Sequence, residues 1–425
     1  MNLPRNGRIL VLDDQPSESA PLIHALSKYG SAVYSFSEFK KPELLPSSPF
    51  DSIRLVFLDL DLNDEISGPA NKAAFAYKIM NSMVKKENQP IIVIAWTTNE
   101  DLFVKTKEYI NSSYKAFVVQ MAKKEFMKGK QYDINKIMEH IEKNLLNVHM
   151  MHLFVDWENM MHEAAGITVN DFSNFFAYPA KWDENMGSLF HKLAKARTGS
   201  QTPELSPQDV IRNALSMLTS TFIDTVEGKT RAAEFSDAVT NLIKNQSQQI
   251  PSDISAKINA KLVFSTHTNQ IEFPGNIYED IAVSGTDKNS LITEMTKEKT
   301  DGMTKEQVNV LRAELKNRSR LVFLVVNAMC DYAENKWRTL RLVPGFTCLE
   351  KYKKILDRTD SNHLSPLVFY GNELCYIFFD LGSVVSVPLK SIKNKPKVVM
   401  RHEFLVDIQS RLSRHINRPG TAYLE

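Results

Sequence analysis

The feature that most constrains this sequence is a set of four short apolar runs, each ending in polar or charged residues. The runs read RILVLDD from Arg8, LVFLDLDL from Leu55, IIVIAWTT from Ile91 and FVVQMAKK from Phe117. A short run that is apolar on both faces is typical of a strand buried inside a parallel sheet. In such sheets, ligands bind just beyond the carboxyl ends of the strands. We therefore expect the polar residues that follow these runs to form one site.

Strands and helices are expected to alternate along the first third of the chain. The sequence predicts strands at 8–12, 32–36, 53–58, 91–96 and 116–119, and helices at 19–29, 71–85, 103–111 and 134–146. Alternation of this kind is typical of an α/β fold with helices on both faces of a parallel sheet. We predict a five-stranded, parallel, doubly wound (flavodoxin-like) domain over residues 1–147.

The pattern changes at about residue 148. Residues 148–247 have mainly helical character, including a long apolar periodicity at 208–226, and 246–253 has the composition of a linker. The remainder, 254–425, mixes expected strands at 261–264, 321–326, 367–370, 374–379 and 384–387 with expected helices at 301–318 and 402–415. The sequence therefore predicts a second, mixed α+β region over 148–425, whose output it does not reveal.

Composition indicates an ordinary folded protein rather than a binder of polyanions. The 425 residues include 52 Lys and Arg against 50 Asp and Glu, for a net charge of +2. The three cysteines, Cys330, Cys348 and Cys375, form neither a disulfide framework nor a close metal-ligand pattern. Neither the amino-terminal segment nor any later apolar run has the length of a signal or membrane segment. We expect a cytoplasmic protein that does not contact a membrane.

The four runs together resemble the response-regulator receiver family over residues 6–147. The resemblance implies that Asp13, Asp14 and Asp59 bind Mg²⁺, and that Asp59 accepts a phosphoryl group from a histidine kinase. It also implies that Thr97 and Lys123 contact the phosphoryl group. These residue types suit the chemistry, because Mg²⁺ prefers oxygen ligands and relieves the repulsion between crowded carboxylates. No enzymatic activity is expected beyond Mg²⁺-dependent self-phosphorylation and autodephosphorylation.

Several assignments stay open at this stage. Asp61 lies on the same side as Asp59 by period-two alternation, and is a rival acceptor. Ala95 competes with Thr97 for the position that contacts the phosphoryl group, and Lys124 competes with Lys123. A receiver that has lost phosphorylation and serves only for docking is a further alternative.

The C-terminal region carries less specific signals. Cys330 follows an apolar run and is interpreted as a buried cysteine rather than a nucleophile. His162 and Glu163 are interpreted as a surface pair, since Gly166 stands where a zinc-protease helix needs its second histidine. His149, His152 and His162 differ in helical phase, so no metal site is expected there. The basic segment 388–402 is interpreted as a solvated face or a surface for an acidic partner, in preference to a nucleic-acid groove.

One further resemblance concerns this region. VVNAMCDYAENK, RLVPG and RHINRPG look like segments of receiver-bearing proteins from bacterial antiviral operons of the Detocs type. This implies a response regulator in a phosphorelay that acts as a phosphate sink or binds a partner, such as a second receiver protein or a second copy of itself. The alternative is an effector whose C-terminal region is a novel enzyme or nucleic-acid-binding module gated by the receiver.

Overall fold

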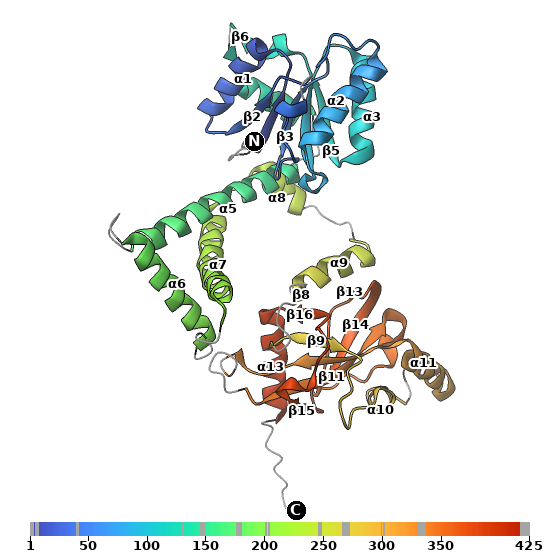
Figure 1. Cartoon of the computed structure of the whole chain (residues 1–425). Coiled ribbons are helices and arrows are strands. Elements are labelled where there is room, and N and C mark those ends of the chain that lie inside the picture. Colours follow the sequence, from blue (N-terminus) through green and yellow to red (C-terminus); the bar gives the residue numbers. More distant parts are fainter. Residues whose placement is uncertain are drawn as a thin grey trace, which may run out of the picture. The chain divides into compact units, whose positions relative to one another are not determined.

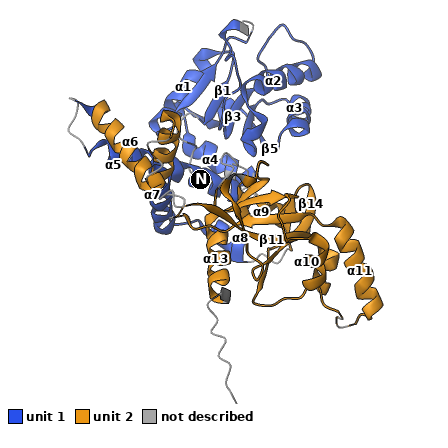
Figure 2. Ribbon diagram, turned by 60° about the horizontal axis from the view of Figure 1, so that its bottom comes forward, with its two compact units in different colours: residues 1–182, 218–246 blue, residues 183–217, 247–425 orange. Residues whose placement is uncertain are grey.

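The chain contains two compact units in the computed structural model. Residues 1–182 and 218–246 form one unit, and residues 183–217 and 247–425 form the other (Figures 1 and 2). The structure describes residues 4, 8–39, 42–129, 131–144, 149–175, 181–199, 202, 205–244, 249–265, 273–298, 300, 302–329, 331 and 337–416. The predicted domain boundary at residue 147 stays a prediction.

The first unit is built on a five-stranded sheet with the strand order β2-β1-β3-β4-β5, in which all neighbouring strands are parallel. Its strands are β1 (Ile9–Leu12), β2 (Val33–Phe36), β3 (Leu55–Asp59), β4 (Ile91–Trp96) and β5 (Ala116–Met121). Its helices are α1 (Pro16–Lys28), α2 (Pro69–Met83), α3 (Glu100–Ser113) and α4 (Ile134–Asn144). A short 3₁₀ turn, Pro42–Leu44, lies between β2 and β3. The short β6 (Met127–Lys128) and β7 (Gln131–Tyr132) form a hairpin before α4.

Alternation along each strand divides the core between the two faces of this sheet. In β1, Ile9 and Val11 pack with α1 and α4, whereas Leu10 and Leu12 pack with α2 and α3. All four side chains are almost fully buried. A strand covered on both faces has no polar position, which is why these runs are apolar throughout. The predicted flavodoxin-like fold is therefore confirmed.

The first unit also contains helices from later in the chain. Helix α5 (His149–Ser173) places Met151 and Val155 in the core formed by α1 and α4. Helix α7 (Pro207–Ala232) belongs to this unit from residue 218 onward, and an ion pair of 2.9 Å between Lys229 and Glu163 joins it to α5. The short α8 (Asp237–Lys244) contacts α5. The predicted surface pair His162–Glu163 lies on α5.

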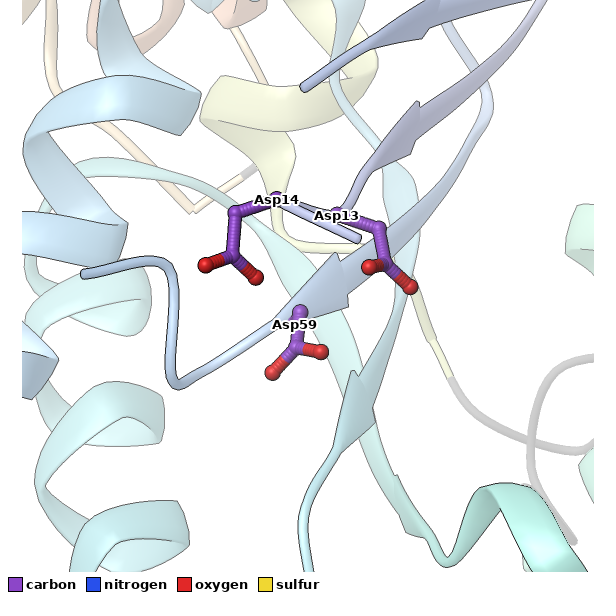
Figure 3. A group of neighbouring side chains, drawn as sticks. All are labelled: Asp13, Asp14 and Asp59. Carbon is purple, nitrogen blue, oxygen red and sulfur yellow. The ribbon is translucent and has the colours of Figure 1, made fainter. Parts of the chain in front are cut away.

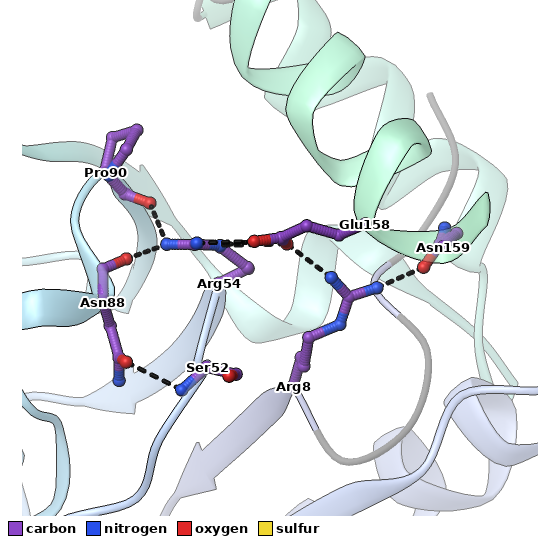
Figure 4. Close-up of polar contacts among 7 residues, drawn as sticks. All are labelled: Arg8, Ser52, Arg54, Asn88, Pro90, Glu158 and Asn159. Atoms are coloured by element: carbon purple, nitrogen blue, oxygen red, sulfur yellow. Dashed lines mark hydrogen bonds and ion pairs between the residues drawn. The ribbon is translucent and has the colours of Figure 1, made fainter. Parts of the chain in front are cut away.

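A polar cluster joins α5 to the amino ends of β1 and β3 (Figure 4). Arg8 precedes β1 and is only 2% exposed, and its guanidinium donates to Glu158 and Asn159 of α5. Arg54 precedes β3, and its Nε lies 3.0 Å from the Glu158 carboxylate oxygens. Burial lowers the pKa of Arg8, and the charge of Glu158 opposes this shift. One carboxylate therefore forms ion pairs with two guanidinium groups.

The second unit contains a nine-stranded antiparallel sheet with the path β12-β14-β11-β10-β9-β16-β8, in which β13 pairs with β14 and β15 with β11. The strands are β8 (Phe264–Ser265), β9 (Asn276–Glu279), β10 (Leu321–Val325), β11 (Thr339–Leu349), β12 (Asn362–Leu364), β13 (Val368–Tyr370), β14 (Glu373–Asp380), β15 (Val385–Pro388) and β16 (Val398–Met400). The helices are α6 (Trp182–Thr198), α9 (Ser252–Val263), α10 (Lys288–Glu294), α11 (Lys305–Arg318) and α13 (His402–Ile416). Side chains of α9 and α13 share one core, and those of α10 and α11 share another.

One predicted strand of this unit is wrong. The segment 261–264 was expected to be extended, but Lys261, Leu262 and Val263 complete helix α9, and only Phe264 belongs to a strand. Ala256, Ala260 and Val263 follow one helical stripe, and the last two pack into the core shared with α13. Burial of this stripe stabilises a helix at 261–263, where the local apolar composition had suggested a strand. In the described part of the whole chain, no helix is long and apolar enough to cross a membrane.

We expect Glu158→Gln to lower the free energy of unfolding of the first unit by about 2–4 kcal/mol, because it removes the carboxylate that pairs with both the buried Arg8 and Arg54. Glu163→Gln is the matched control on the same helix. Its ion pair with Lys229 is exposed, so we expect a loss below about 1 kcal/mol. Urea unfolding followed by circular dichroism measures both changes. Equal losses in the two variants would contradict the role assigned to Glu158.

Candidate functional site

Three aspartates lie together at the carboxyl edge of the parallel sheet (Figure 3). Asp13 and Asp14 directly follow β1, and Asp59 is the last residue of β3. Strands β1 and β3 are neighbours in register, so that Leu12 pairs with Leu58. The strand ends therefore place all three carboxyl groups at one point, as the sequence predicted.

The three carboxyl groups are spaced to hold a metal ion. One ligand oxygen from each of Asp13, Asp14 and Asp59 lies within 4.8 Å of the others. Within the described part of the chain, this is the one group of His, Cys, Asp and Glu side chains with such spacing. The Oδ1 atom of Asp14 is buried and has no hydrogen-bond partner among the described residues. Burial, with the charges of Asp59 and Asp13, raises the pKa of Asp14 to about 6.

Lys123 supplies the positive charge of the site. It begins the 3₁₀ turn Lys123–Phe126 after β5, and its Nζ lies 2.7 Å from Asp13 Oδ2 and 2.8 Å from Glu18 Oε2. The same ammonium donates to Asp59 Oδ2. Burial alone would lower the pKa of Lys123, but the charge of Asp59 and the hydrogen bonds to these carboxylates raise it above its ordinary value. One ammonium thus faces the carboxylates of Asp13, Asp59 and Glu18, which leaves the site short of positive charge.

Backbone groups orient two of the aspartates. Asp59 is 8% exposed, and its Oδ1 accepts the backbone N–H of Asp61 at 2.9 Å. Asp13 is 2% exposed, and its Oδ1 accepts the N–H of Gln15 at 2.9 Å. Burial raises the pKa of Asp59, although the charge of Lys123 acts in the opposite direction. The second oxygen of each side chain points to Lys123.

The rival acceptor Asp61 lies outside this cluster. Its side chain is 53% exposed and forms an ion pair with Lys72 of α2. Lys124, the rival of Lys123, is exposed. The structure therefore places Asp59 and Lys123 together, whereas their rivals Asp61 and Lys124 are exposed.

Thr97 and Ala95 have different surroundings at the end of β4. Ala95 is fully buried in the core that α2 and α3 cover. The Thr97 side chain lies just past the strand, and its Oγ1 accepts the N–H of Asn99 at 3.0 Å. This bond uses a lone pair of the hydroxyl and leaves its proton available to donate. Thr97 has no hydrogen bond to the three aspartates among those of the described residues.

Sequence reasoning missed Glu18, the third carboxylate that contacts Lys123. Glu18 lies in the first turn of α1, where acidic residues are common because they favour the helix N-terminus. Its position in a helix therefore gives no indication that it contacts Lys123, which lies far along the sequence. Of the other residues singled out, Cys330 lies outside the described residues. Cys348 and Cys375 are buried, and burial raises the pKa of each thiol to about 12, so neither is an activated nucleophile.

Comparisons with known proteins give little further information. No protein-family model and no curated protein matches this sequence. One similar solved structure is described as a response regulator from Burkholderia pseudomallei with a phosphorylated aspartic acid, a calcium ion and citrate. It is 15% identical, covers 40% of this chain and 89% of its own, and has a TM-score of 0.22. Another is a yeast Spc42 trimeric coiled-coil segment fused to a further structure, at 14% identity, 40% and 97% coverage and a TM-score of 0.21. At these TM-scores, neither likeness supports a functional conclusion.

Proposed function

We propose that this chain is a response regulator in which Asp59 accepts a phosphoryl group from a histidine kinase. The observation that carries the proposal is the placement of Asp59, which is buried at a strand end between two further acids and the ammonium of Lys123. Lys123 favours the ionised form of this carboxylate and the Asp61 N–H orients it, as a nucleophile requires. The finer parts of the proposal, including the kinase as phosphoryl donor, rest on the resemblance of the four apolar runs.

The residues around Asp59 suit phosphoryl transfer. A carboxylate oxygen of Asp59 attacks the phosphorus of a phosphohistidine, so that a P–O bond forms as the P–N bond breaks. The imidazole nitrogen leaves with the bonding electrons and takes up a proton. Lys123 moves its contact from the carboxylate to a phosphoryl oxygen. The Thr97 hydroxyl donates a hydrogen bond to a second phosphoryl oxygen. A divalent cation bound by Asp13, Asp14 and Asp59 would offset the charge that develops on the phosphoryl oxygens.

A divalent cation fits the charge and the chemistry of this cluster. The buried Asp14 oxygen without a partner and the excess of carboxylates over ammonium groups both favour such an ion. Oxygen ligands of this kind suit Mg²⁺. We therefore assign Mg²⁺ as the proposed cofactor, held by Asp13, Asp14 and Asp59.

The role of the phosphoryl group is a separate proposal. The phosphate-sink or partner-binding role in antiviral defence rests only on the Detocs-like segments of the C-terminal region, and the comparisons offer it no support. Much of VVNAMCDYAENK and RHINRPG lies outside the described residues. Genes for a histidine kinase and a second receiver protein next to the gene for this chain would support the proposed role.

We expect Asp59→Asn to abolish phosphorylation by acetyl phosphate, because the amide is not a nucleophile for phosphorus. Asp61→Asn is the matched control, and we expect it to be phosphorylated like the unchanged chain, since Asp61 is exposed and paired with Lys72. Intact-protein mass spectrometry in the presence of Mg²⁺ measures the added phosphoryl group. Undiminished labelling of the Asp59 variant would overturn the assignment.

We also expect the affinity for Mg²⁺ to fall about tenfold between pH 7 and pH 5. The pKa of Asp14 is about 6, so its ionised, metal-binding fraction falls by about this factor over that interval. Asp14→Asn should bind Mg²⁺ more weakly at pH 7 and lose most of this pH dependence, whereas Asp61→Asn should retain both. Isothermal titration calorimetry at the two pH values measures the affinities. Wild-type affinity that does not change with pH would contradict the expectation.

A further inference from the structure

A cavity of about 580 Å³ opens in the second unit, far in sequence from the acidic cluster. It lies between the end of α9, strand β8, the β13–β14 hairpin and strand β16. Its volume falls within the range of about 300–1,000 Å³ that is usual for small-molecule sites. Nothing in the proposed receiver chemistry uses it.

Positive side chains dominate the rim of this cavity. Lys261 of α9, Lys397 before β16 and Arg401 after it all line the cavity and are exposed. Arg401 is held in place, because its Nε donates to the Lys261 carbonyl oxygen at 3.0 Å. Lys397 lies 3.8 Å from the carboxylate of Glu279, whereas Lys261 forms no ion pair within the described part of the chain. The rim therefore offers cationic groups to an anion.

Two polar side chains that are less exposed than the cationic groups also line the cavity. Glu279 is the last residue of β9, and its side chain is 12% exposed and paired with Arg320 at 3.3 Å. Tyr370 of β13 is 3% exposed. Burial raises the pKa of the Tyr370 phenol, and the charge and hydrogen bond of the neighbouring Glu279 carboxylate add to this shift. Both residues line the cavity, so this polar pair offers hydrogen-bonding groups to a ligand.

An exposed aromatic ring adds a flat apolar wall. Phe369 of β13 lines the cavity and is 36% exposed, a large fraction for a phenylalanine within a sheet. The turn that follows it, Gly371 and Asn372, has positive φ at both residues and is fixed by Arg320, which donates to the Gly371 carbonyl oxygen at 3.2 Å. Gly371 has a φ of +54°, and a Cβ there would also displace the Arg320 guanidinium, so this position favours glycine.

We propose that this cavity binds a nucleoside monophosphate. Lys261, Lys397 and Arg401 contact its phosphate, and Phe369 stacks on its base. The Tyr370 hydroxyl and the Glu279 carboxylate hydrogen-bond to polar groups of the ligand. Phosphate contacts by Lys and Arg together with stacking on an aromatic ring are the usual means of binding this class of ligand. The volume of the cavity suits one nucleotide rather than a longer strand.

The test is titration of the full chain with AMP, GMP, CMP and UMP by isothermal titration calorimetry. EDTA is included so that the acidic cluster cannot hold a metal–nucleotide complex. We expect saturable binding of at least one nucleotide at one site per chain. Lys261→Ala should weaken it about tenfold through loss of a charged hydrogen bond. Phe369→Ala should weaken it about fivefold to a hundredfold through loss of stacking.

Two control variants test whether the nucleotide binds in this cavity. Lys305→Ala removes an exposed lysine of α11 outside the cavity, and Asp59→Asn changes the acidic cluster; neither should alter the affinity. Three results would overturn the proposal. The first is that none of the four nucleotides shows saturable binding. The second is that inorganic phosphate binds with the same affinity as the nucleotides and that Phe369→Ala has no effect. The third is that the chain binds single-stranded oligonucleotides but no nucleoside monophosphate.

Discussion

Mutual repulsion among three carboxylates at one edge of the parallel sheet is the constraint on which the first unit depends. The strand order places β1 beside β3, and the apolar content of both strands fixes their ends at the same level. Crowded acids destabilise each other unless a cation is near. Lys123 offsets part of this repulsion, and Asp14 keeps a buried oxygen without a partner. A bound divalent cation would offset the remaining repulsion, and it would also offset the negative charge that a phosphoryl group on Asp59 adds.

The two units show opposite imbalances of charge. In the first, aspartates outnumber the ammonium group that faces them, so the site favours a cation. In the second, Lys261, Lys397 and Arg401 surround a cavity whose one lining carboxylate, Glu279, is already paired with Arg320. That cavity favours an anion. The net charge of +2 for the whole sequence gives no sign of either local imbalance.

The sheet and the acidic cluster of the first unit were predictable because both follow from local patterns. Asp13, Asp14 and Asp59 stand directly after apolar strands, and parallel strands bring such positions together. Other features depend on contacts across the sequence. Pro344 and Gly345 look like strand breakers, yet both lie inside β11, where Gly345 allows close approach of the Phe378 carbonyl oxygen. The cavity of the second unit joins Lys261 with Tyr370 and Arg401, and no spacing in the sequence indicates that they meet.

Strands β1 and β3 are anchored by charged contacts at both ends. Arg8 and Arg54 hold their amino ends to Glu158, and Asp13 and Asp59 share Lys123 at their carboxyl ends, about 16 Å away along the strands. A slip of one strand against the other by a single residue would turn its side chains to the opposite faces. It would also separate both charged clusters at once. The pairing of Ile9 with Leu55 is therefore specified by electrostatics as well as by burial, and the central register of the sheet has no low-cost alternative.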